Sequence, residues 1–334
     1  GWQLDPFGHS AASAALLGRM GLDSLVINRI NYNLKYRWRS ARHMEFEWRH
    51  GSAQASSWQG PLTHVLHTHY SSPKGLDFEG RGRDRVASST EGDVLRAAIR
   101  SRSEAYRTKE LLILIGDDFK WLKAQGNYEN WERLIKELNP KGRRSSSGIK
   151  IFFSTPQRYF AAVAAQRPSL KGPGLPTFYG DLLPYADNRE SFWTGFYATR
   201  PTLKSLIRSS FAAVHAAQLL FVLARAKLLS DGHTKVLRDW FDALVKSRRN
   251  VAIVQHHDAI TGTSRANVVE DYERMLREAT SKALGVAAAA AAQLLRKSED
   301  SEEEGLPPLS ERLGKLFEQP SSSAAATAAA AAAR

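Results

Sequence analysis

Short apolar runs alternate with helical patterns through the first two-thirds of the chain. Such runs are typical of buried strands, and apolar positions three and four residues apart are typical of helices. Strands are expected around Gln3–Leu4 and over Ser24–Ile27, Leu111–Ile115 and Ile149–Phe153. Because strands that alternate with helices form βα units, the pattern predicts an α/β fold with a mostly parallel, barrel-like β/α sheet.

Capping residues mark helices between these strands. Ser10 suits the N-cap of the first helix, because its hydroxyl accepts from free backbone N–H groups, and Gly21 suits its end. The expected helices run from Ser10 to Met20, from Thr90 to about Arg107, and over Trp131–Leu138.

A different pattern begins near Asp187, where long helices replace the alternating elements. Apolar residues recur with the helical period from Leu203 to Leu228, and Pro201 is tolerated in the first turn of that helix. Two more helices are expected over Thr234–Lys246 and from Thr263 to about Ala283. Three successive helices favour a small three-helix bundle.

The predicted organisation has three parts. Residues 1–186 form a partial β/α domain, residues 187–282 form the helical bundle, and residues 283–334 form a low-complexity, Ala-rich tail. The tail contains the acidic stretch Ser298–Glu304 and the alanine tract Ala324–Ala333, a composition that gives no reason to expect a packed core.

Composition narrows the chemistry. The 334 residues include no cysteine, so disulfides and thiolate metal sites are excluded, and any metal has to be held by His and carboxylate side chains. The formal net charge is +13, but the basic stretches Arg81–Arg85 and Lys141–Arg144 are not interleaved with aromatic residues as in a base-stacking surface. Nucleic acid is therefore not an expected partner.

No apolar run reaches the length of about 18 residues that spans a bilayer. The apolar stretch Phe211–Leu229 is interrupted by His215, Gln218, Arg225 and Lys227. We therefore expect no membrane span in this chain.

Charged residues follow three of the expected strands. Asp5 follows the first, Arg29 follows the second, and Asp117 and Asp118 follow the third. Ligands bind beyond the carboxyl ends of parallel strands, so these side chains are expected to meet at one edge of the sheet. For Asp117 and Asp118 taken alone, a helix N-cap beside an uninvolved carboxylate is the commoner arrangement.

His256, His257 and Asp258 follow the apolar run Val251–Val254, which resembles a strand. Neighbouring histidines rarely share one metal ion, and a buried, hydrogen-bonded histidine is the commoner interpretation. In the alternative, one imidazole binds zinc and the other supports the site through a hydrogen bond. His9, in the turn before the first helix, suits either a cap or a packed turn residue.

Six sequence blocks carry a more specific signal. They are Trp2–Ser10 (WQLDPFGHS), Gly116–Phe119 (GDDF), Ser154–Tyr159 (STPQRY), Tyr185–Asp187 (YAD), Phe192–Pro201 (FWTGFYATRP) and Gln255–Ser264 (QHHDAITGTS) followed by Asp271-Tyr272. In this order the chain, from Gly1 to about Ala279, resembles glycoside hydrolase family 38, the retaining α-mannosidases. The segments His69–Pro73 and Ser154–Pro156 are closer to its lysosomal-type branch than to its Golgi-type branch.

The resemblance implies a zinc-dependent α-mannosidase that acts on mannose-containing oligosaccharides such as N-glycans. Asp5 would be the nucleophile and a zinc ligand, His257 would be a second zinc ligand, and Asp118 would be the general acid/base. The mannose pocket would be lined by Phe7, Arg29, Tyr70, Trp193 and Asp258. Retaining glycosidases use two carboxyl groups about 5–5.5 Å apart. Residues 1–186 would then be part of a catalytic domain, and the bundle would carry a zinc-ligand histidine.

One departure from the family concerns the metal. The family takes two more zinc ligands from a His-x-Asp motif on an earlier strand, and neither His43–Glu45 nor His257–Ala259 supplies it. The family's C-terminal β-rich region is not matched either, so the chain resembles a fragment. Catalytic zinc usually has three protein ligands, so this polypeptide alone is expected to bind zinc weakly and to hydrolyse little or no substrate.

Two alternatives stay open beside the enzyme. One is a non-catalytic, carbohydrate-binding relative that has lost the zinc site, and the other is a polyanion-binding protein, suggested by the net charge. The joint presence of Asp5, Asp118 and His257 favours the enzyme. By resemblance, the compartment is the lysosome, the vacuole or another endomembrane lumen, whereas the oligomeric state does not follow from the sequence.

Overall fold

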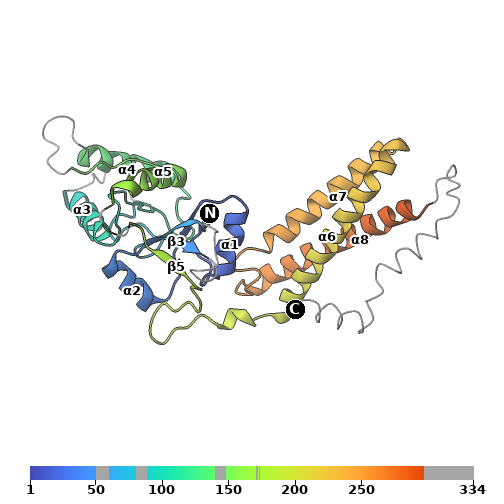
Figure 1. The fold of residues 1–334 in the computed structure, drawn as a ribbon, viewed down its shortest axis with the longest axis horizontal. Coiled ribbons are helices and arrows are strands. Elements are labelled where there is room, and N and C mark those ends of the chain that lie inside the picture. Colours follow the sequence, from blue (N-terminus) through green and yellow to red (C-terminus); the bar gives the residue numbers. More distant parts are fainter. Residues whose placement is uncertain (50–59, 80–88, 140–147, 171, 173, 297–334) are drawn as a thin grey trace, which may run out of the picture. The chain divides into compact units, whose positions relative to one another are not determined.

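The computed structural model describes residues 1–49, 60–79, 89–139, 148–170, 172 and 174–296 (Figure 1). The chain divides into two compact units, Gly1–Gly195 and Phe196–Arg334, which are described separately below. The basic stretches Arg81–Arg85 and Lys141–Arg144 and most of the expected tail, with its acidic and alanine tracts, lie outside the described residues.

The first unit is built on a five-stranded sheet with the order β1-β2-β4-β3-β5. The strands are β1 (Trp2–Gln3), β2 (Ser24–Ile27), β3 (Glu45–Arg49), β4 (Leu62–Val65) and β5 (Thr177–Tyr179). All neighbours are parallel except the β3–β4 pair. The predicted α/β class with a mostly parallel sheet is therefore confirmed.

Helices cover both faces of this sheet. The helices of this unit are α1 (Ala11–Arg19), α2 (Tyr32–Ala41), α3 (Ser89–Ser103), α4 (Ala124–Leu138), α5 (Pro156–Gln166) and the short 3₁₀ helix η1 (Arg167–Ser169). Helices α3 and α4 pack against each other in a cluster that, among the described residues, contains no strand residue. Leu25 and Ile27 of β2 pack in a cluster with side chains of α1 and α2, whereas Val26 packs with α5. Successive side chains of a strand point to opposite faces, so α1 and α2 cover one face and α5 covers the other.

Local sequence explains where two of these helices begin. The Ser10 hydroxyl accepts from Ala12 N at 3.2 Å, as expected for the N-cap of α1. The Thr155 hydroxyl accepts from Arg158 N at 3.3 Å at the start of α5, and proline stands at the first position of that helix. The sequence pattern predicted α1 but missed α2 and α5.

The prediction of a strand is wrong for two of the apolar runs. Leu111–Ile115 and Ile149–Phe153 form no strand, and their backbone is irregular. Their side chains are nevertheless partly buried against three clusters, with Ile113, Ile115 and Ile151 beside Trp131 and Leu134 of α4. Apolar burial alone therefore explains these runs, because a short apolar run does not by itself specify a strand.

The second unit is a three-helix bundle of α6 (Pro201–Ser230), α7 (Thr234–Ile253) and α8 (Ala266–Leu295), preceded by the 3₁₀ helix η2 (Gly195–Tyr197) at its boundary with the first unit. Its core joins residues from all three long helices, among them Leu203, Leu244 and Leu276. The run Val251–Val254, which resembled a strand, is instead the end of α7 and the residue after it. The expected Ala-rich tail begins within α8, which continues to Leu295.

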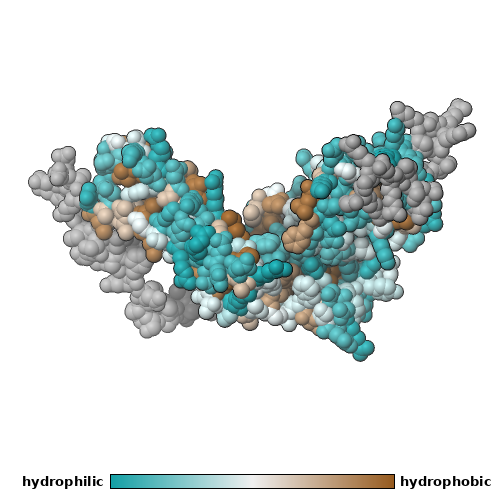
Figure 2. Space-filling view, turned by 180° about the vertical axis from the view of Figure 1, so that it is seen from behind, coloured by the Kyte–Doolittle hydropathy of each residue, from teal (hydrophilic) through white to brown (hydrophobic). Residues whose placement is uncertain are grey.

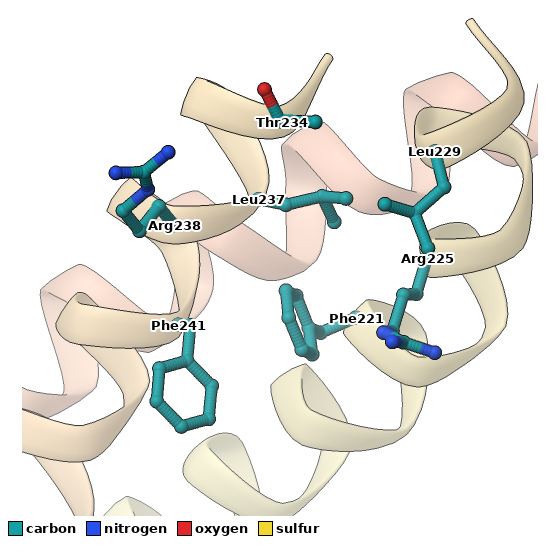
Figure 3. Close-up of a pocket in the computed structure, with 7 residues that line it drawn as sticks. All are labelled: Phe221, Arg225, Leu229, Thr234, Leu237, Arg238 and Phe241. Carbon is teal, nitrogen blue, oxygen red and sulfur yellow. The ribbon is translucent and has the colours of Figure 1, made fainter. Parts of the chain in front are cut away.

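Hydrophilic side chains cover much of the surface, and apolar side chains form separate patches, as the brown areas in Figure 2 show. In the bundle, Phe221, Leu237 and Phe241 line a shallow groove between α6 and α7 with Arg225 and Arg238 at its sides (Figure 3). This groove contains none of the predicted site residues.

No apolar stretch long enough to span a bilayer was expected, but among the described residues α6 has the length and apolar composition of a membrane span. This is weak evidence, because a core helix of a bundle passes the same test. Buried residues of α6, such as Ile207 and Val214, belong to the bundle core.

Candidate active site

Asp5 and Arg29 meet at the carboxyl edge of the sheet. In the β1–β2 ladder Gln3 is aligned with Ile27, so each charged residue lies two positions beyond its strand. Arg29 Nε donates to Asp5 Oδ1 at 2.5 Å, and the same guanidinium also contacts this oxygen through Nη2. Both side chains are mostly shielded from solvent, at 13% and 22% exposure. Charge-assisted bonds of this kind fix both groups in one geometry.

Tyr70 contacts Asp118 and lies within electrostatic range of Asp5 and Arg29. The Tyr70 hydroxyl donates to Asp118 Oδ1 at 3.2 Å. Burial raises the pKa of Tyr70 above its ordinary value, and the carboxylates of Asp5 and Asp118 raise it further, while Arg29 opposes them. The pKa of Tyr70 therefore depends on the charges of both carboxylates and of the guanidinium. Asp5 and Arg29 meet at the carboxyl edge of the sheet as expected, whereas the run before Asp118 is not a strand and Asp118 contacts Tyr70.

An aromatic wall surrounds the Arg29 guanidinium. Its central carbon lies 4.9 Å from the ring centroid of Trp193, 5.6 Å from that of Tyr185 and 5.8 Å from that of Phe7. The Trp193 ring packs against Phe7 at 5.0 Å and against Tyr185 at 5.2 Å. Cations are attracted to aromatic faces at these distances. Predicted residues Phe7 and Trp193 thus share one wall with Arg29.

Tyr185 and His69 are neighbours of this site to which the sequence interpretation gave no role. Tyr185 accepts a hydrogen bond from Arg29 Nη1 at 3.3 Å. The His69 ring lies 3.9 Å from that of Tyr70, and burial, aided by the Arg29 charge, lowers its pKa. Both residues lie in segments that resemble the family, Tyr185–Asp187 and His69–Pro73. This resemblance was the sequence signal that could have assigned them to the site.

Asp118 sits in a turn that other loops hold in place. Asp117 Oδ1 accepts from Asp118 N at 2.8 Å, and Gly116 N donates to Ser72 Oγ at 2.8 Å. The Glu79 carboxylate accepts from Trp121 N at 2.7 Å and from Leu122 N at 3.1 Å.

This turn does not cap a helix. Helix α4 begins at Ala124 with Lys123 in the cap position, so the N-cap interpretation of Asp117 and Asp118 is wrong. Phe119 and Trp121 have positive φ angles of 57° and 68°. Residues in this strained region persist where their surroundings fix them, as the Glu79 bonds do here.

The second unit carries a separate group of candidate metal ligands. His256, His257 and Asp258 follow α7, and one ligand atom from each lies within 4.8 Å of the others. His256 Nε2 is 3.5 Å from Asp258 Oδ2, and the two imidazole rings are 4.1 Å apart. Imidazole nitrogens with carboxylate oxygens are a donor set that zinc accepts.

Local hydrogen bonds shape this segment. Asp258 Oδ1 accepts from Thr263 Oγ1 at 2.6 Å, and the backbone oxygen of Asp258 accepts from Ser264 Oγ at 2.8 Å. Arg200 Nη1 donates to the backbone oxygen of Gly262 at 2.7 Å. Gly262 has a φ of +80°, and a Cβ there would lie 2.8 Å from Thr199 O. The turn therefore requires glycine at this position.

Of the two alternatives for His9, a helix cap or a packed turn residue, the structure shows the packed turn residue. Its backbone exchanges hydrogen bonds with Leu182 at 3.1 and 2.8 Å, and its ring is buried 6.4 Å from Trp48. Burial lowers the pKa of His9 to about 4, and its Nε2 has no hydrogen-bond partner.

Family models match both units. Residues 1–188 match the model described as "Glycosyl hydrolases family 38 N-terminal domain", and residues 191–294 match the one described as "Alpha mannosidase middle domain". The chain belongs to glycosyl hydrolase family 38. The resemblance stated from the six sequence blocks is therefore confirmed.

Curated family 38 proteins are similar over most of this chain. It is 33% identical over 287 residues to a lysosomal alpha-mannosidase of Dictyostelium discoideum, covering 83% of this chain and 27% of that protein. It is 34% identical over 315 residues to alpha-mannosidase 2x of Mus musculus, covering 84% and 27%. The chain thus spans about a quarter of the length of these relatives. The two identities do not separate a lysosomal-type branch from another.

A solved alpha-mannosidase structure has the same fold. The crystal structure of an alpha-mannosidase from Enterococcus faecalis V583 superposes with a TM-score of 0.64 at 18% identity, covering 88% of this chain and 29% of the other.

Proposed function

We propose that this chain supplies the catalytic carboxylates of a zinc-dependent, retaining α-mannosidase that acts on mannose-containing oligosaccharides. The observations that carry the proposal are the contact of Arg29 with Asp5, the contact of Tyr70 with Asp118, and the electrostatic influence of Asp5 and Arg29 on the pKa of Tyr70. The similarity to proteins named alpha-mannosidases supports the substrate class.

Asp5 is the nucleophile in this mechanism. Its carboxylate attacks the anomeric carbon, the glycosidic C–O bond breaks, and a covalent glycosyl-Asp5 ester forms. Arg29 fixes the position of the Asp5 carboxylate through the bond to Oδ1. Water then attacks the same carbon, the ester bond breaks, and mannose leaves with its configuration retained.

Asp118 is the general acid and then the general base. It donates its proton to the leaving oxygen in the first step and takes a proton from water in the second. The Tyr70 hydroxyl, which donates to Asp118 Oδ1 at 3.2 Å, orients the carboxyl group. Asp118 is exposed in this chain, so solvent reaches it for the second step.

Asp5 and His257 are the residues of this chain that would hold zinc, with the remaining ligands from the family's His-x-Asp motif. The His256, His257 and Asp258 cluster offers donor atoms suited to zinc, which supports the assignment. When bound, the ion supplies charge stabilisation and a template for sugar hydroxyls. Asp258 and the aromatic wall of Phe7, Trp193 and Tyr185 would complete the mannose pocket.

The proposed organisation follows from these roles. Residues 1–186 act as part of a catalytic domain, and residues 187–282, with the rest of α8 up to Leu295, act as a bundle that brings a metal ligand. The expected compartment is the lumen of the lysosome or another endomembrane compartment, supported by similarity to a protein named lysosomal alpha-mannosidase.

The test is hydrolysis of an aryl α-mannoside by the protein at its natural full length, with and without added zinc. The wild type should release the aryl alcohol, chelation should abolish the release, and Asp5→Asn should be inactive with zinc present. Arg19→Gln, a change on α1 away from the site, is the matched control and should retain activity. A wild type that binds mannosides but hydrolyses none would instead indicate the non-catalytic relative.

A further inference from the structure

Lys35 is a buried lysine that the mechanism does not use. It lies in α2, its residue is 9% exposed, and its Nζ donates three hydrogen bonds to protein oxygens. The acceptors are Asn28 O at 3.0 Å, Asn28 Oδ1 at 2.8 Å and Thr68 O at 2.6 Å. An ammonium has three donors, so all of them are used on neutral acceptors.

The acceptors lie at the carboxyl ends of two adjacent strands. Asn28 follows β2 and stands directly before Arg29, whereas Thr68 follows β4 and stands two residues before Tyr70. The backbone connection of these strands reaches Leu66, whose N–H donates to Ile27 O at 2.9 Å. Lys35 continues the connection beyond that point, where the strands lead into the site.

Burial of this ammonium has a cost that packing alone does not explain. Burial lowers the pKa of Lys35 to about 7, and the charges of Arg39 and Arg29 add to the effect. A methionine would fill a similar volume without a buried charge, and buried charges are tolerated where they are fully hydrogen-bonded. The three hydrogen bonds therefore offset the cost of burying the charge, and they also hold Asn28 and Thr68 to the same ammonium group.

We propose that Lys35 is a positioning residue that ties the ends of β2 and β4 together and thereby sets Arg29 and Tyr70 against Asp5 and Asp118. The inference rests on the proposed function, because it assigns Arg29 and Tyr70 to that site. Lys35 acts through these two residues and contacts no reacting atom itself.

The experiment compares Lys35→Met with Arg37→Met in the zinc-loaded, full-length protein. Arg37 lies on the same helix but is exposed, so its variant should behave as wild type. Lys35→Met should lower kcat for an aryl α-mannoside about 10- to 100-fold, because a displacement of about 1 Å in a site costs about this much. KM should change by less than about threefold, since the aromatic wall stays in place. A kcat within twofold of wild type overturns the proposal.

A double-variant comparison separates positioning from a general structural role. If Lys35 acts through Tyr70, Lys35→Met should cost far less in a Tyr70→Phe background than in the wild type. If the double variant loses the product of the two single-variant losses in kcat, the proposal is contradicted. Should Lys35→Met not fold, Asn28→Ala removes one acceptor and should give a smaller kcat loss with the same dependence on Tyr70. An unchanged kcat in Asn28→Ala contradicts it.

Amide hydrogen exchange tests the same inference without activity. Exchange at residues 28–30 and 66–70 should be faster in Lys35→Met than in Arg37→Met, because the strand ends are released. Unchanged exchange there overturns the positioning role. If the wild type hydrolyses no mannoside but exchange rises as expected, the proposed function fails while the connection through Lys35 stands.

Discussion

At the scale of single residues, Asp118 stands out for its surroundings. It is exposed, lies in a turn fixed by Ser72 and Glu79, and contacts Tyr70. A group held in this way is oriented without being sealed from water, and both properties suit a carboxyl group that passes a proton in each direction.

Replacement of Asp118 by Asn should depend on the leaving group. For an oligosaccharide, kcat should fall about 10²- to 10⁴-fold, because the departing sugar oxygen needs a proton. For 2,4-dinitrophenyl α-mannoside the first step should be nearly unaffected, because this phenolate departs unprotonated. Steady-state and burst kinetics on both substrates measure the difference.

Asp117→Asn is the matched control for that comparison. It changes the neighbouring carboxylate, so the ratio of the two substrate rates should stay as in wild type. Equal losses on both substrates for Asp118→Asn, or a leaving-group effect in Asp117→Asn, would contradict the assignment.

Part of the site was predictable from residues that follow strands. Asp5 and Arg29 lie just beyond the parallel strands β1 and β2, and they contact each other. Asp118 follows Leu111–Ile115, which is not a strand, and its contact is with Tyr70. No role was predicted for Tyr185 and His69, because their contacts with the site depend on the tertiary fold of loops, which a local sequence pattern does not show. Whether His257 shares a metal with Asp5 stays a prediction.

At the scale of elements, the sequence pattern also missed β3, a strand that carries a buried polar residue. β3 reads Glu-Phe-Glu-Trp-Arg, and Glu45 is buried because it pairs with His64 of β4 at 3.2 Å and accepts from Tyr159 of α5. A charged residue is normally read as solvent-facing, so a strand with an inward glutamate is missed. Of its two partners, His64 is 19 positions away and Tyr159 is 114 positions away, so no local pattern shows them.

The long helices of the bundle were easier to predict from the sequence, because a sustained helical period of apolar residues is a strong signal.

The packing of the bundle leads to a prediction about stability. Leu276 of α8 is fully buried in the bundle core, so Leu276→Ala should lower the free energy of unfolding by about 2–5 kcal/mol. Leu284 on the same helix is 54% exposed, and Leu284→Ala should cost far less.

Urea unfolding followed by helical circular dichroism measures both variants. Equal losses for the two leucines would contradict the assigned core of the bundle.

At the scale of the whole molecule, buried histidines predict sensitivity to acid. The pKa of His9 is lowered by burial to about 4, so the unfolded chain binds a proton below pH 6.5 that the folded chain does not. Stability from this group is therefore complete above pH 6.5 and is lost as pH falls toward 4. His67, whose pKa burial and nearby cations also lower to about 4, acts in the same direction.

His9→Leu removes one of these groups. Between pH 7 and pH 5 the variant should lose about 1–2 kcal/mol less unfolding free energy than the wild type. Denaturant midpoints at the two pH values measure this, and His233→Leu, an exposed control, should follow the wild type. Identical pH dependence in His9→Leu and wild type would contradict the burial argument.

The chain covers about a quarter of the length of its family 38 relatives, yet both matched domains occur in it. In the proposed retaining mechanism, Asp5 carries a covalent ester.

The most direct measurement traps that ester with a 2-deoxy-2-fluoro-α-mannosyl fluoride and identifies the modified peptide by mass spectrometry of the full-length, zinc-loaded protein. The account predicts one added fluoromannosyl group on the peptide that contains Asp5, and none in Asp5→Asn. Turnover without a trapped sugar, or a sugar trapped on a different carboxylate, would contradict it.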